Sequence, residues 1–369
     1  WGRVEHVHVQ RGGVPQLSAH RQTVGAIHGP RAAGDRMRVL YGIQGTGHGH
    51  ISRARELLPV LSEQAHVDVL ISGYNCQLSL DGYRILRRRG VSFQYDSDGN
   101  VDVLATAREL RPVRLMRDIH GLDLEPYDLV ISDFEPVTAW AAALQGRRCV
   151  GLSHQAAFLS DKSPRPEKES IVAEQVMKFF APSSQAIGFH FQRYDAFIEP
   201  PIIRKQVRDL NPTPGEHITV YLPAYHHDAL KEVFAAHRQV QWQVFSPYCE
   251  TPKEHGNVAV NPVSNERFLK SFEGCLGVVT SGGFETCAES MFMDKKLLVM
   301  PIRNQYEQLC NAAALAELGI PVLQGWGEES TEKVDAWIRD PDRVHLPEYA
   351  DAGKVVRLAL EHARQEKAA

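Results

Sequence analysis

The sequence predicts an α/β protein of two Rossmann-like domains, each a doubly wound parallel sheet, that face a central cleft. Short apolar runs alternate with helical periods from Met37 onward, as in parallel sheets with helices on both faces. The alternation stops at a stretch with four prolines, 198–216, and then restarts. At 369 residues the chain also suits two domains better than one.

The strands are expected wherever short apolar runs end at turn residues. In the first half they are expected over 38–43, 67–71, 91–95, 128–133 and 148–152. In the second half they are expected over 217–222, 241–245, 258–260, 276–280 and 296–300.

Helices are expected between the strands, with an amphipathic one over 51–61. We expect domains over 37–203 and 204–348, and a C-terminal helix within 349–369 that packs on the surface or crosses back to the first domain. Residues 1–36 lack an apolar period and are expected to be a disordered extension or the result of a start site placed too early.

The bulk properties exclude several classes of protein. A formal net charge of -4 gives no indication of a nucleic-acid partner. No apolar run approaches the length of a transmembrane helix. Six cysteines are present without a CxxC pair, so neither a zinc knuckle nor a disulfide framework is indicated. A reducing, cytoplasmic location is expected.

A glycine-rich joint, "GTGHGH", follows the first expected strand. Its candidate ligand-contacting residues are Gly45, Gly47, His48, Gly49 and His50. A dinucleotide fingerprint would need glycine in place of His50 and an acid at the end of the second strand, which reads "LISGYN". Nicotinamide binding is therefore disfavoured. The helix dipole disfavours imidazolium at a helix start, so a histidine there can accept a proton; alternatively, the glycines only allow tight packing.

A second small-residue turn, "TSGGFETCAES", also leads from a strand into a helix. Backbone amides at Gly282 and Gly283 suit a phosphate, and Thr280 and Ser281 can add hydroxyl donors. Glu289 is placed for neighbouring sugar hydroxyls, since it would repel the phosphate itself.

In the stretch "MPIRNQYEQLCNAAALAELGI" (300–320), a strand is expected to end at Pro301 and a helix to follow. Glu307, Gln308 and Asn311 lie on its first turns, and a carboxylate beside an amide can bind hydroxyl groups. Each motif alone is weak, because acids at helix starts are usually solvated. Their order and spacing together are more specific.

These motifs resemble the GT-B glycosyltransferases, in particular the lineage of the lipid II-forming UDP-N-acetylglucosamine transferase and the UDP-glycosyltransferases. The similar stretches are "GHISR" (49–53), "LSHQAAF" (152–158), "IEPPIIR" (198–204), the Gly283 to Glu289 spacing, and "EQLCNA" (307–312). In "LSHQAAF", His154 and Gln155 fall on the acceptor-side loop. The resemblance implies that His50 is the base, Glu289 contacts ribose, and Glu307 and Gln308 contact the sugar.

The resemblance further implies inverting, metal-independent transfer from a UDP-sugar, bound by the second domain, to an acceptor hydroxyl in the first. It implies no cofactor, because the nucleotide-sugar is a substrate. One departure is "YLPAYHHDAL" (221–230), which stands where the lipid II enzyme has a glycine-rich phosphate loop. His226, His227 and Asp228 there could bind a metal or simply start a helix.

Other points stay open on the sequence alone. Asp133 or Glu135 could orient His50, or both could cap the following helix. "DSD" (96–98) could bind a metal or form a turn. Arginines 84, 87, 88, 89, 108, 111, 114 and 117 could favour an anionic or lipid-linked acceptor, with peripheral association at the inner membrane face, or could be solvated. A UDP-N-acetylglucosamine 2-epimerase and a non-catalytic sensor are the alternative functions.

Overall fold

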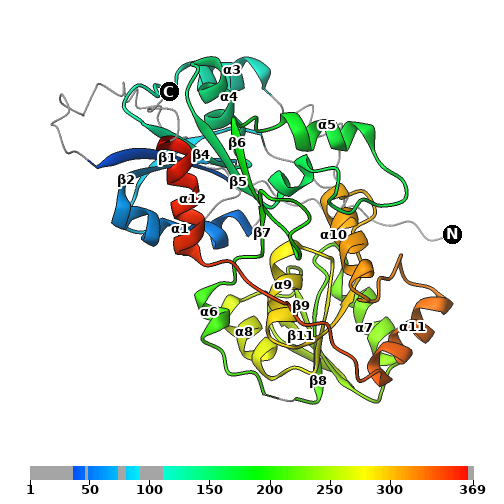
Figure 1. Ribbon diagram of the computed structural model, residues 1–369. Coiled ribbons are helices and arrows are strands. Elements are labelled where there is room, and N and C mark those ends of the chain that lie inside the picture. The colour runs from blue at the N-terminus through cyan, green and yellow to red at the C-terminus, as the bar shows by residue number, and fades with distance from the viewer. Residues whose placement is uncertain (1–35, 46–48, 74–79, 92–110, 214, 365–369) are drawn as a thin grey trace, which may run out of the picture. The chain divides into compact units, whose positions relative to one another are not determined.

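The computed structural model describes residues 36–45, 49–73, 80–91, 111–213 and 215–364. It contains two sheets with helices packed on their faces (Figure 1). The chain leaves the first sheet after β7 and enters the second at His217, passing through the short helix α6 (Lys205–Arg208). Both sheets belong to one compact unit.

The first sheet has seven parallel strands in the order β3-β2-β1-β4-β5-β6-β7. The strands are β1 (Met37–Gln44), β2 (Ala65–Ser72), β3 (Arg84–Arg88), β4 (Leu129–Asp133), β5 (Cys149–Ser153), β6 (Gln185–Phe189) and β7 (Ile198–Glu199). Because the strands run parallel, the loops that leave β1, β4 and β5 lie along one edge. Ligands of doubly wound sheets bind at that edge.

Helices cover both faces of this sheet (Figure 1). They are α1 (Gly49–Gln64), α3 (Pro112–His120), α4 (Pro136–Leu144), the 3-10 helix η1 (Gln155–Leu159) and α5 (Ile171–Phe179). α1 buries its apolar stripe, including Ile51, Leu58 and Leu61, against the sheet. α4 buries alanines on the opposite face, where small side chains allow close approach.

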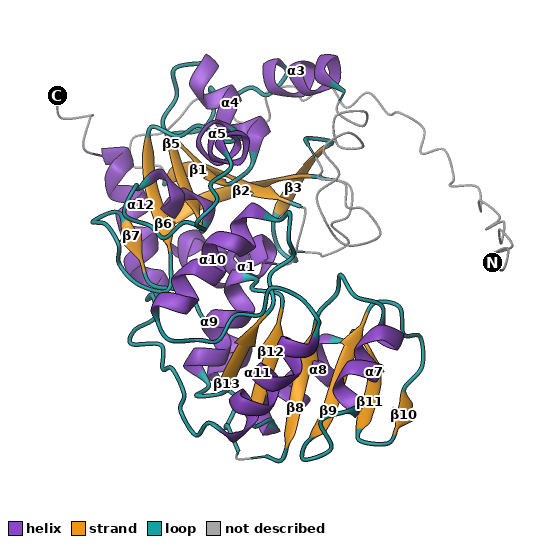
Figure 2. Ribbon diagram, turned by 90° about the vertical axis from the view of Figure 1, so that its right-hand side faces the viewer, coloured by secondary structure: helices purple, strands orange, loops and turns teal. Residues whose placement is uncertain are grey.

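The second sheet has the order β10-β11-β9-β8-β12-β13, and only β10 is antiparallel to its neighbour. Figure 2 shows its strands side by side. The strands are β8 (His217–Tyr221), β9 (Gln241–Ser246), β10 (Lys253–His255), β11 (Val258–Pro262), β12 (Gly277–Thr280) and β13 (Lys296–Val299). The helices are α7 (His227–Ala235), α8 (Asn265–Gly274), α9 (Phe284–Phe292), α10 (Tyr306–Glu317) and α11 (Glu328–Arg339).

One hydrophobic cluster continues from the first sheet into the second half of the chain. It joins the buried stripe of α1 to apolar residues of α9, such as Phe284 and Met291. The far face of the second sheet has a separate core around Phe234 and Trp242, whose rings stack at 4.3 Å. The shared cluster brings the starts of α1 and α9 into the same region.

The last helix, α12 (Ala352–Arg364), lies against α1 and the first sheet (Figure 1). Ala350 N–H donates to Pro201 O at 2.8 Å. Lys354 Nζ donates to the carboxylate of Glu199 at 3.0 and 3.2 Å. α12 therefore packs against elements of the first half of the chain, although it follows the second sheet in sequence.

The strand expected over 91–95 is wrong at its start, because Val91 follows β3 rather than lying in a strand; 92–95 lie outside the described residues. β3 instead uses Arg84 to Arg88, a stretch with the charge pattern of a basic surface cluster. On this edge strand the arginine stems can lie along the sheet while their charges reach solvent. Of the expected extension, only Arg36 is described. Within the described ranges, no helix has both the length and the apolarity to cross a membrane.

Gly188 on β6 is where the backbone of η1 packs closest to the first sheet. A Cβ there would lie 2.7 Å from Ala157 Cα and N. We therefore expect Gly188→Ala to lower the free energy of unfolding by about 1–3 kcal/mol, because backbone must move. Chemical denaturation measures this. Gly274→Ala is the control, since its nearest neighbours would be 3.8 Å away; equal stability of the two variants would contradict the packing.

Candidate active site

His50 and Asp133 form a buried pair at the carboxyl edge of the first sheet. Asp133 ends β4 beside Ile43 of the neighbouring β1, and His50 is in the first turn of α1. His50 Nδ1 lies 2.7 Å from Asp133 Oδ1. A carboxylate oxygen only accepts, so Nδ1 carries the proton and Nε2 of the neutral ring is an acceptor. This is the arrangement that a histidine base requires.

The charge of Asp133 is stabilised although its side chain is inaccessible. Burial raises the pKa of this carboxyl, but Arg53 and His50 outweigh burial and lower the pKa below its ordinary value. Arg53 donates from Nε to Oδ2 at 2.9 Å and from Nη2 to Oδ1 at 2.8 Å. Asp133 is therefore ionised at neutral pH.

Glu135, expected as an alternative partner of His50, is not used in that way. It is the N-cap of α4, and its carboxylate accepts from the backbone N–H of Val137 at 2.8 Å and of Thr138 at 2.6 Å. Phe134 between the two acids has φ 52°, a left-handed conformation that is costly for a bulky residue. This turn directs Asp133 and Glu135 to different partners, so the sequence prediction for Glu135 is corrected.

Two residues in this region had no role in the sequence prediction. Arg53 also donates from Nη1 to Glu285 Oε1 on α9 at 3.1 Å. A Cβ on Gly49 would lie 2.5 Å from the Glu285 carboxylate, so glycine lets the start of α1 meet that of α9. The spacing of three from His50 to Arg53 places both on one helix face, so the sequence could have indicated that Arg53 lies beside His50. The pairing of Arg53 with Glu285 could not be predicted from the sequence.

The turn before α9 has the geometry of an anion site. Gly282 has φ 83°, which favours glycine. Gly283 is the N-cap, without a side-chain cap, and a Cβ there would meet nothing within 4 Å. Thr280 and Ser281 are buried beside it. The free space beside Gly283 thus lies at the positive end of the helix dipole.

His154 and Gln155 contact the first turns of α10. Gln155 Nε2 donates to Glu307 Oε2 at 2.9 Å, and His154 Nε2 lies 2.8 Å from Asn311 Oδ1. His154 also stacks on Phe284 at 3.9 Å. Two sides of the predicted site, acceptor and donor, therefore touch here.

The protonation of His154 decides the nature of its contact with Asn311. Its Nδ1 lies 2.7 Å from Phe189 O and must donate to it. Asn311 Nδ2 donates to Gly282 O at 3.1 Å, which turns Oδ1 to the histidine. Only a doubly protonated His154 would complete both bonds. Burial lowers the pKa of His154 below its ordinary value, although the nearby Glu307 opposes this, so the neutral ring donates to Phe189 O alone.

Two predicted donor residues are engaged within the protein. Glu289 is 2% exposed, and both its oxygens accept from Arg204, at 2.6 and 2.7 Å. Gln308 Nε2 lies 3.5 Å from Ser281 Oγ, while its Oε1 accepts from Ile302 N–H at 3.1 Å. Contacts of these residues with ribose or sugar therefore stay predictions.

Other residues that the sequence predicted for the site have other contacts or lie outside the described residues. Gly45 N–H donates to Ser72 O at 2.6 Å. Gly47, His48 and the "DSD" motif (96–98) lie outside the described residues.

Among the arginines, Arg84 pairs with Asp68 at 3.2 Å, and Arg108 lies outside the described residues. Arg111, Arg114 and Arg117 are exposed on or beside α3. Their part in acceptor binding stays a prediction.

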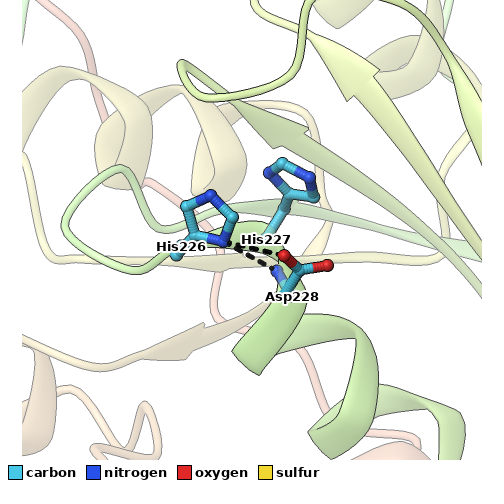
Figure 3. Close-up of side chains that lie close together, drawn as sticks. All are labelled: His226, His227 and Asp228. Atoms are coloured by element: carbon cyan, nitrogen blue, oxygen red, sulfur yellow. Dashed lines mark hydrogen bonds and ion pairs between the residues drawn. The ribbon is translucent and has the colours of Figure 1, made fainter. Parts of the chain in front are cut away.

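His226, His227 and Asp228 lie together at the start of α7 (Figure 3). His226 Nδ1 accepts from Asp228 N–H at 3.3 Å, so His226 caps the helix. Lys231 Nζ donates to Asp228 Oδ1 at 2.9 Å. The histidine rings are stacked at 4.4 Å, and His226 Nδ1 and Asp228 Oδ1 already have partners within the protein. Capping accounts for the geometry better than metal binding.

No curated protein matches the sequence of this chain. Among solved structures, MurG of Acinetobacter baumannii is 13% identical with a TM-score of 0.57, over 88% of this chain and 99% of MurG. The calicheamicin glycosyltransferase CalG4 is 15% identical with a TM-score of 0.57, over 90% and 94%. SnogD of Streptomyces nogalater is 17% identical with a TM-score of 0.53, over 90% and 99%.

At these identities the likeness shows the fold, and that fold is GT-B, as the resemblance implied. The model of the family described as "Glycosyl transferase family 1" matches residues 37–339. The chain therefore belongs to glycosyl transferase family 1, and it is a GT-B glycosyltransferase that acts on a nucleotide-sugar donor and an acceptor.

Proposed function

We propose that the protein transfers a sugar from a UDP-sugar to an acceptor hydroxyl, with inversion and without a metal. The observation that carries the proposal is the His50–Asp133 pair, 2.7 Å apart, which Arg53 links to the start of α9. His50 Nε2 takes the acceptor proton while the acceptor oxygen bonds to the anomeric carbon. The bond from that carbon to the diphosphate breaks, and its electron pair leaves with UDP. One displacement inverts the anomeric centre.

The start of α9 is proposed to stabilise the departing diphosphate in place of a metal. Gly283 leaves room for phosphate oxygens, since a Cβ there would meet nothing within 4 Å, and the N–H groups of the first turn would donate to them. Ser281 and Thr280 border this turn. Glu289, Glu307, Gln308 and Asn311 are proposed to contact ribose and sugar, by the resemblance of their spacing to that of the GT-B lineage.

The acceptor is proposed to carry an apolar part. A cavity of about 280 Å³ opens beside the β4 and β5 loops and is lined by Phe134, Leu159 and Phe179 among others. On the adjoining α5, Ile171 and Val172 are 80% and 71% exposed. Large apolar side chains that are exposed side by side are typical of a binding surface. A lipid-linked acceptor at the inner face of a membrane would fit this surface.

His50→Gln tests the base. The variant should lower kcat by about 10²- to 10⁴-fold, the usual contribution of acid–base catalysis, and should leave the Kd for UDP within about twofold. Turnover is measured with whichever sugar nucleotide, screened by thermal shift against UDP, GDP and TDP, stabilises the protein. His120→Gln, an exposed histidine on α3, is the control. Full turnover by His50→Gln would refute the assignment.

Gly283→Asp tests the diphosphate site. Its φ of -62° and ψ of 133° suit any residue, and Asp is a good N-cap. The Tm should therefore stay equal or rise. The new carboxylate should raise the Kd for UDP at least about tenfold by repulsion, and Gly283→Asn should do so less. Calorimetry in EDTA and in magnesium chloride should give one Kd. Unimpaired UDP binding by Gly283→Asp would place the diphosphate elsewhere.

The acceptor proposal predicts that lipid-linked sugars accept better than the same sugars without the lipid, by at least about tenfold in kcat/KM. Phe179→Asp should reduce this preference, because it places a charge in the apolar wall. Radiolabelled donor and product extraction into butanol measure it. Equal use of both acceptors would show that the cavity binds no apolar chain.

A further inference from the structure

Arg53 connects the His50–Asp133 pair to the second half of the protein. Its guanidinium uses two nitrogens for Asp133 and the third, Nη1, for Glu285 on α9. The side chain is buried, and its cationic carbon lies 5.5 Å from the centre of the Phe189 ring. A buried fork with three engaged nitrogens has a fixed position.

The positive charge of Arg53 disfavours protonation of His50, although Arg53 helps to hold Asp133 and thereby the His50 ring in place. Arg53 Nη2 lies 3.3 Å from His50 Nδ1. When His50 takes up a second proton and becomes imidazolium, its positive charge is therefore repelled by the guanidinium. Asp133 is also largely neutralised by Arg53. If only Asp133 and Arg53 are considered, their charges sum to zero. Asp133 then orients the His50 ring, but the pair gives the imidazolium little net electrostatic attraction.

Glu285 alters this balance. With Asp133, Arg53 and Glu285 present, the cluster has one positive and two negative charges, so its net charge is -1. Proton uptake by His50 brings it to zero. Among the described residues, Tyr41 also faces the cluster; burial and Asp133 raise its pKa, so it stays neutral. Arg204 and Glu289 also act on Glu285, but they pair with each other at 2.6 Å and together add no net charge. The second negative charge comes from the donor-binding half.

We propose that Glu285, acting through Arg53, is a positioning residue that makes His50 an effective base only when α9 is docked against α1. The inference rests on the proposed role of His50. Proton removal from the acceptor would then be linked to the same helix start that holds the departing diphosphate. A sugar donor would not be attacked while the two halves are apart.

Glu285→Gln tests the inference because Gln keeps an acceptor oxygen for Arg53 and removes only the charge. Glu285 is partly exposed, so the variant should fold, which the Tm verifies. Without the charge, imidazolium is less stable. Glu285→Gln should therefore lower kcat about tenfold, with the Kd for UDP unchanged within about threefold. Glu285→Asp keeps the charge and should restore kcat to within about threefold of the wild type.

Glu174→Gln is the matched control. Glu174 on α5 accepts from Tyr306 of α10 at 2.6 Å, so it also joins the two halves, but it does not contact Arg53. The kcat of Glu174→Gln should equal that of the wild type within about twofold. A kcat for Glu285→Gln equal to that of the wild type, or a loss of kcat that Glu285→Asp does not reverse, would overturn the inference. Failure of the proposed base would appear separately, as full turnover by His50→Gln.

Discussion

The buried carboxylate of Asp133 is the constraint on which the site depends. A charge without access to water must be paired, and here three hydrogen bonds come from His50 and Arg53. Both partners lie on one face of α1, so the carboxylate fixes the rotation of that helix as well as the ring. The position of β4 beside β1 makes this possible, because parallel neighbours bring their carboxyl ends to the same edge.

The N-termini of α1 and α9 meet at this edge. Each is the positive end of a helix dipole, so their approach is unfavourable unless a negative charge lies between them. The Glu285 carboxylate occupies that place, since it approaches Gly49 of α1 from the first turn of α9. Its own charge is in turn paired with Arg53. The diphosphate proposed for the open side of α9 would thus meet a helix dipole whose nearest carboxylate is already engaged.

The prediction from sequence was good for elements with clear periodicity. The strands around β1, β4, β5, β8 and β12 and the helix α1 lie where the apolar patterns indicate. The prediction was wrong at β3, which was expected over 91–95. The Arg-rich sequence of β3 has no apolar strand pattern, because an edge strand buries little of its side chains. For the site, the pattern identified His50 and its candidate acids, but it could not choose between Asp133 and Glu135. Both lie in the same turn, and only the left-handed Phe134 separates their directions.

By itself the sequence determined the two-sheet α/β class, the histidine at the start of α1 and the glycine turn before α9, because each is a local pattern of periodicity or turn chemistry. Only the tertiary structure decided that Glu135 caps α4, that Glu289 pairs with Arg204, and that Arg53 spans from Asp133 to Glu285. These pairs are far apart in the chain or compete for equivalent partners. Which charges meet depends on how the strands and helices pack, and no local pattern encodes that.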